Sequence, residues 1–140
     1  RDQETDDAMT FLSDLAAHLA AASTSPSLTV GTNLFMQSRP DSPSTCVILY
    51  ETSDQSPSQT FGSGAPAYEH RGVQAVTRAD GHAAAESLAR EVFDVMNLIV
   101  NETVGSTVVL RCEAKQSPFP LRRDSQHRME FVCNYAFAIL

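Results

Sequence analysis

The sequence predicts an α+β domain in which two helices pack on one face of an antiparallel or mixed β-sheet of four to five strands. Three observations support this class. Two segments carry apolar residues at helical spacing, several short runs are rich in β-forming residues, and the last segment alternates strictly between large apolar residues and smaller or polar ones. The expected order of elements is α-β-β-β-α-β-β.

The first helix is expected over residues 6 to 23. Leu12, Leu15 and Leu19 recur at intervals of three and four, which places them on one face. Asp6 suits the positive end of the helix dipole, and Pro26 disfavours helical backbone in the residue before it. The segment therefore predicts an amphipathic helix with a start signal and a stop signal.

Three strands are expected before the second helix, the first of them in the two short candidate runs around Gly31. Short runs at 28–30 and 33–36 are rich in β-forming residues, and the continuous apolar run 46–51 is typical of a central strand. A turn is expected at 39–43, because its two prolines remove two backbone donors. The chain then returns as a strand at 68–78, antiparallel to 46–51.

Residues 52–67 form a stretch dominated by Ser, Pro and Gly. A loop of this length is uncommon in so small a domain and usually has a function or is disordered. We expect a flexible loop that becomes ordered against a neighbouring molecule, with Phe61 as its large apolar anchor.

A second helix is expected to begin at Asp80, which would cap it, and to end near Asn101. Glu86 and Glu91 fall on its outer face. Its apolar stripe comprises Ala85, Leu88, Val92, Val95, Met96 and Ile99.

The final strands are expected at 107–116 and 129–140. No proline interrupts the second of these, so we expect it to be an uncovered sheet edge that pairs with another chain. Its large side chains on one face are Met129, Phe131, Cys133, Tyr135, Phe137 and Ile139.

Length and charge limit the function. The 140 residues predict a single domain spanning 1–140. A net charge of −7 argues against a general nucleic-acid binder, which would present a basic face. Acidic residues gather in the first fourteen positions, while half of the ten Lys and Arg residues lie between 111 and 128. This distribution favours contacts between copies, although a solvated surface is the simpler interpretation for any single charge.

No motif for catalysis or for a cofactor is present. Cys46, Cys112 and Cys133 lie apart in apolar runs without CxxC spacing, so free buried thiols are expected. The four histidines are scattered, and neither HExxH nor GxSxG occurs. No apolar run is long enough to cross a membrane. We therefore expect no enzymatic activity, no metal, no cofactor and no membrane association.

Features near the end of the chain leave alternatives open. Asp124 and Arg128 either pair locally or form ion pairs between subunits, and the local pair is the favoured interpretation for Asp124. For Arg78, at the end of a strand, a local pair and an ion pair between subunits both stay possible. Phe119 lies between two prolines and is either tucked under the domain or exposed as an anchor.

Several elements stand in a recognisable order along the chain, and they extend over nearly its whole length. They are Phe11–Leu15, Gly31–Phe35, Arg39–Pro43, Val73–Arg78, the Ala-rich second helix, and the stretch from Gln116 through Asp124 to Phe131 and Asn134. Taken together, they resemble the tail terminator family of long-tailed bacteriophages, often labelled minor capsid proteins.

The resemblance implies a small, non-enzymatic α+β protein that forms a homo-hexameric ring in the neck of the virion, after assembly in the host cytoplasm. Such a ring caps the finished tail tube, ends its polymerisation and presents a surface to the head-completion (stopper) protein. The implied partners are other copies of the chain, the tail tube protein and the stopper. Two other classes stay open: a head-completion or adaptor protein of the neck, and a small cytoplasmic ligand-binding domain or enzyme.

Candidate site residues follow from the expected ring. DNA should pass through its channel without specific binding, so we expect surplus acid near the lumen, with Glu86 and Glu91 as candidates. The candidate contacts with other subunits or with the tube are Phe61, Arg78, Phe119, Arg122, Arg123, Asp124, Arg128 and Phe137.

Overall fold

The computed structural model describes residues 10–23, 27–52, 58–59 and 66–140. These residues form two helices, α2 (Thr10–Ala22) and α3 (His82–Asn97). The strands are β1 (Leu34–Met36), β2 (Cys46–Thr52), β3 (Ser58–Gln59), β4 (Pro66–Ala79), β5 (Val100–Val104), β6 (Thr107–Ala114), β7 (Phe119–Arg123) and β8 (Met129–Ile139).

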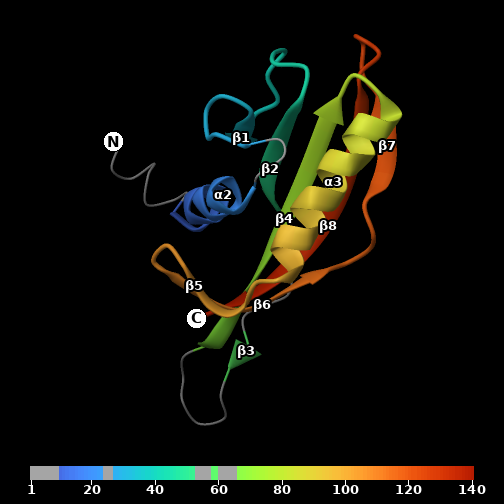
Figure 1. Cartoon of the computed structure of the whole chain (residues 1–140). Helices are drawn as coiled ribbons and strands as arrows, with labels where there is room; N and C mark the ends of the chain where they lie inside the picture. Colours follow the sequence, from blue (N-terminus) through green and yellow to red (C-terminus); the bar gives the residue numbers. More distant parts are fainter. Residues whose placement is uncertain (1–9, 24–26, 53–57, 60–65) are drawn as a thin grey trace.

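One sheet contains all the described strands. Its order is β1-β2-β4-β8-β6-β5, with β3 added to β4 and β7 added to β8. The β1–β2 pair is parallel, and the other pairs are antiparallel. Figure 1 shows α3 in front of the long central strands β4 and β8, with α2 to its left. The predicted α+β class with a mixed sheet and two helices is therefore confirmed.

The predicted strand count and element order were wrong. The described residues form four strands before α3 and four after it, instead of three and two. The missed strands have weak local signals: β3 has two residues, β5 is mostly polar, and β7 contains a proline and two arginines. Within the range predicted as the 52–67 loop, Thr52 belongs to β2, residues 58–59 form β3 and residues 66–67 begin β4. Residues 53–57 and 60–65, with Phe61, lie outside the described residues.

The position of β8 corrects a second prediction. This strand is not a sheet edge, because residues Glu69 to Ala79 of β4 pair with the whole length of β8. On its other side, β7 pairs with its first half and β6 with its second half. The predicted alternation along β8 is present, but two separate partners cover the side that was expected to be open.

The predicted apolar stripes form the main core on the helix side of the sheet. Leu12, Leu15 and Leu19 of α2 are fully buried there. Phe137 of β8 is 1% exposed and meets the ring of Phe11 edge-on, with centroids 5.3 Å apart. From α3, the buried residues are Ala85, Leu88, Ala89, Val92 and Met96.

Both ends of α3 differ from the prediction. Its N-cap is Gly81, with no side-chain hydrogen bond, so Asp80 does not cap the helix. The helix ends at Asn97, with Leu98 as the C-cap, four residues earlier than expected. Beyond it, Asn101 adopts a positive φ of 49° at the start of β5. The end of the helix was predicted too late because apolar residues keep their helical spacing beyond the residue at which the backbone leaves the helix.

A smaller apolar cluster lies on the other side of the sheet. It contains Cys46, Ile48, Val76 and Val132, all of which are buried. The partly buried rings of Phe35 and Tyr50 pack against it. Neither of the two described helices covers this side, so neighbouring loops and polar side chains complete it. The first candidate site lies there.

Candidate interface sites

A polar cavity of about 200 Å³ lies beside the smaller apolar cluster. We call it the arginine cavity. It is lined by Arg39, Asp41, Arg78, Arg122, Asp124, Ser125, Arg128 and Glu130.

Strand alternation puts Arg78 and Glu130 on this side of the sheet. They are register partners on β4 and β8. Their neighbours Ala79, Met129 and Phe131 belong to the cluster that packs on α3. Because successive side chains of a strand point to opposite faces, Arg78 and Glu130 point away from the helices.

The Arg78 side chain is inside the molecule, with only 1% of the residue exposed. Its Nε donates to the carbonyl oxygen of Ser44 (3.2 Å), and its Nη2 donates to that of Pro43 (2.8 Å). A buried guanidinium needs such partners to offset its desolvation. The residue that we predicted as an interface candidate therefore fastens the β1–β2 loop to the sheet.

Glu130 is fully buried, and its two carboxylate oxygens have different surroundings. Oε1 lies 3.1 Å from Arg122 Nε and 3.4 Å from Arg39 Nη1. Oε2 has no hydrogen-bond partner among the described residues. An unsatisfied buried acceptor costs about 1–3 kcal/mol, and more when it is charged. Beside a cavity, this atom is available to a donor from outside the described residues, either water or a group of another chain.

Asp124 and Arg128 form the predicted local pair. Asp124 Oδ2 lies 2.8 Å from Arg128 Nε, and Oδ1 accepts the N–H groups of Gln126 and Arg128 at 2.9 Å. The Arg128 guanidinium also donates to the Asp41 carbonyl. Desolvation alone would raise the pKa of Asp124, but the hydrogen bonds from Arg128 and Gln126 outweigh it and lower that pKa. The pair fixes the β7–β8 turn.

Strand β7 is the exposed border of the arginine cavity. Phe119 is 39% exposed and Leu121 is 45% exposed, so the structure favours the exposed alternative for Phe119. Arg122 keeps half of its side chain in solvent, and Arg123 Nη1 donates to the His127 carbonyl (3.0 Å). Large apolar side chains beside accessible arginines are typical of protein interfaces.

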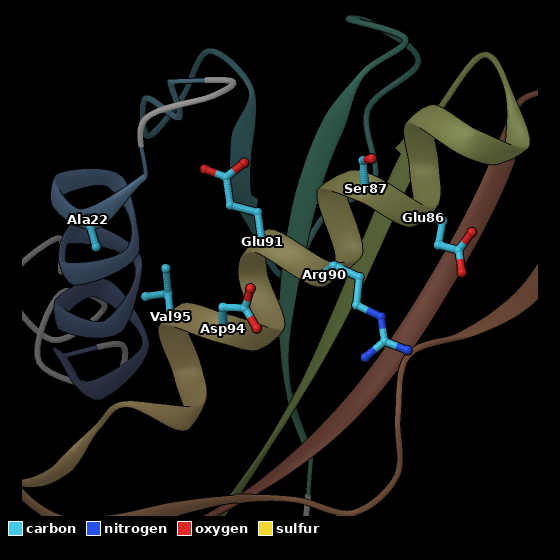
Figure 2. Close-up of a pocket in the computed structure, with 7 residues that line it drawn as sticks. All are labelled: Ala22, Glu86, Ser87, Arg90, Glu91, Asp94 and Val95. Carbon is cyan, nitrogen blue, oxygen red and sulfur yellow. The ribbon is translucent and has the colours of Figure 1, made fainter.

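The second candidate site is an open groove of about 500 Å³ along the outer side of α3 (Figure 2). We call it the α3 groove. Figure 2 shows Glu86 and Arg90 extending from the side of α3 away from α2, whereas Glu91 lies on the α2 side. Arg90 also lies over the Phe93 ring, 5.4 Å from its centroid. The lining residues are Ala22, Glu86, Ser87, Arg90, Glu91, Asp94 and Val95.

The remaining sequence candidates are not brought together. Phe137 lies in the main core, and Phe61 falls outside the described residues. Sequence reasoning missed Arg39 and Glu130. Glu130 lies on the polar side of the β8 alternation, but its meeting with Arg39 depends on a loop that local patterns do not place.

The cysteines are free, as expected; Cys46 and Cys133 are buried and Cys112 is half-buried. Burial raises the pKa of all three thiols, that of Cys112 to about 12. These thiols are therefore protonated and weakly nucleophilic at neutral pH. Across the described ranges, no group of three or more His, Cys, Asp or Glu residues is placed to hold a metal ion. No helix in that part of the chain is long and apolar enough to cross a membrane.

Comparison with known proteins adds a family. A family model described as bacteriophage tail terminator protein matches residues 21–140. One solved structure, which carries no functional name, covers 99% of this chain and 95% of its own at 17% identity, with a TM-score of 0.54. At that identity the likeness concerns the fold alone. No curated protein matches the sequence.

Proposed function

Because the chain belongs to the bacteriophage tail terminator family, we propose that it forms a ring on the end of the tail tube, stops tube growth and joins the tail to the head connector. The family is one of structural proteins of the phage tail, so the chain is a virion component. The match over residues 21–140 carries the proposal, since it includes both candidate interface sites.

The ring would contain six copies. A contact between two different surfaces of neighbouring subunits closes into a ring when its rotation fits. The chain has two chemically different surfaces of this kind, namely β7 with the arginine cavity, and the α3 groove. Ring contacts through the last strand are not part of the proposal, because β8 is covered on both sides.

The channel would let DNA pass without gripping it. Six copies with a formal charge of −7 each carry about −42 in total, and DNA carries a negative charge about every 1.7 Å along its axis. We place part of this acid at the lumen, with Glu91 as the candidate on α3. Glu86, our other lumen candidate, lies on the side of α3 away from α2, and its role is taken up below.

The test has two parts. Native mass measurement of the purified chain should show a hexamer, and micrographs of phage lacking the chain should show tails of uncontrolled length. A monomer that does not add to tail tubes, together with tails of normal length in its absence, would contradict the proposal. Normal-length tails that fail to join heads would point instead to a head-completion protein.

A further inference from the structure

The arginine cavity calls for a ligand with two kinds of polar group. Glu130 Oε2 needs a donor. Arg39 and Arg122 use Nη1 and Nε on Glu130, and their side chains are 30% and 53% exposed, so further guanidinium N–H groups face solvent. These groups need acceptors, and carboxylates are the strongest ones available in proteins. The four arginines and three carboxylates that line the cavity also leave one net positive charge.

We propose that the arginine cavity of one copy receives α3 of the neighbouring copy. In this contact Glu86 accepts hydrogen bonds from the guanidinium groups of Arg39 and Arg122. Ser87 or Arg90 donates to Glu130 Oε2. The proposal rests on the ring of copies proposed above and assigns the pair of surfaces that would close it.

Helix α3 presents both required groups within one turn. Glu86, Ser87 and Arg90 are exposed and line the α3 groove. Residues three and four apart share one side of a helix, which puts the Glu86 carboxylate and the Arg90 guanidinium side by side. Figure 2 shows the two side chains extending in the same direction from the helix. The exposed Ala83 and Ala84 in the preceding turn would let the β7 border come close.

The two surfaces lie on opposite sides of the sheet. α3 packs on the side of Ala79, Met129 and Phe131, while Arg78 and Glu130 point to the other side. A contact between them is therefore head-to-tail, the type that generates rings. Phe119 and Leu121, on the same strand as Arg122, would add the apolar part of the contact.

The proposed pairing of the arginine cavity with α3 can be tested by reversing one charge on each surface and then mixing the two variants. Arg122→Glu damages the cavity of every copy, and Glu86→Arg damages every helix. Each variant alone should lose rings in native mass spectrometry, with at least a tenfold weaker association. An equimolar mixture should form rings again, because the reversed helix fits the reversed cavity and the native helix fits the native cavity. These mixed rings should contain three copies of each variant.

The mixture also controls for folding, since a misfolded variant cannot re-form rings with its complement. Arg111→Glu and Glu113→Arg are matched controls, because both side chains are 63% exposed on β6 and line neither site. Neither control should change ring formation.

Three outcomes would overturn the pairing and leave the ring in place. The mixture could stay monomeric while the wild type forms rings. Alternatively, Glu86→Arg could assemble normally, or the cavity could be occupied by the acidic residues 1–9 or by the tail tube protein, as shown by cross-linking from position 122. A monomeric wild type would instead count against the proposed ring itself.

Discussion

The helix side of the sheet is closed by apolar packing from α2 and α3, whereas the opposite side is closed by loops that arginines hold in place. On the helix side, most of the buried residues of α2, α3 and β8 belong to stripes with a regular period. On the other side, Arg78, Arg128 and Glu130 are buried because of partners far away in the sequence. The packed side therefore contributes mainly stability, whereas the opposite side combines buried charges with a cavity and is the side on which we propose a contact with another copy.

The largest effect should come from the helix side. Phe137→Ala removes a ring that is 1% exposed and packs against Phe11, and the cavity left behind should lower the free energy of unfolding by about 3–5 kcal/mol. Urea denaturation measures this change. Phe119→Ala on exposed β7 is the control and should cost less than about 1 kcal/mol. An equal loss of unfolding free energy in the two variants would contradict the difference between the buried core at Phe137 and the exposed strand at Phe119.

A smaller loss is expected on the other side. Arg78→Met keeps much of the side-chain volume but removes the donors to the Ser44 and Pro43 carbonyls, so unfolding should become easier by about 2–3 kcal/mol. Amide hydrogen exchange should also accelerate at residues 44 and 45 of the loop. Arg111→Met, at a side chain that is 63% exposed, provides the control. An unchanged exchange rate at the loop would mean that packing alone holds it.

The smallest effect concerns pH. Hydrogen bonds lower the pKa of Asp124, so the folded state binds its proton less readily than the unfolded state does. Its contribution is therefore fully present above the ordinary value of 3.8 and is lost as the pH falls through the lowered folded value. Thermal melting should separate wild type from Asp124→Asn at neutral pH, and the gap should narrow below that ordinary value. A gap that does not change with pH would exclude the charge of Asp124 as its cause.

The two sides also differ in how far the sequence predicts them. The α2 leucines, most of the α3 stripe and the large apolar face of β8 are local periodic signals, and they were identified correctly. The opposite face of β8 differs from the expected pattern, because Glu130 and Val132 on it are buried as well. The Asp124–Arg128 pair spans one turn and was identified too. Strand β7 was missed because Pro120 and its arginines resemble a loop. The meeting of Arg39 with Glu130 requires the strand register and the path of a loop, neither of which is encoded within a short window.

The place of β8 has a consequence for how the chain folds. This strand follows all the other described elements in the sequence, yet it lies in the middle of the sheet. It pairs with β4 on one side and with β6 and β7 on the other. Until it pairs, the side of β4 that faces β8 has no partner among the described strands that precede α3. Contacts between residues so distant in sequence raise the contact order and slow folding. An unpaired β4 also offers a template for aggregation, so synthesis at high concentration should favour misassembly before β8 is in place.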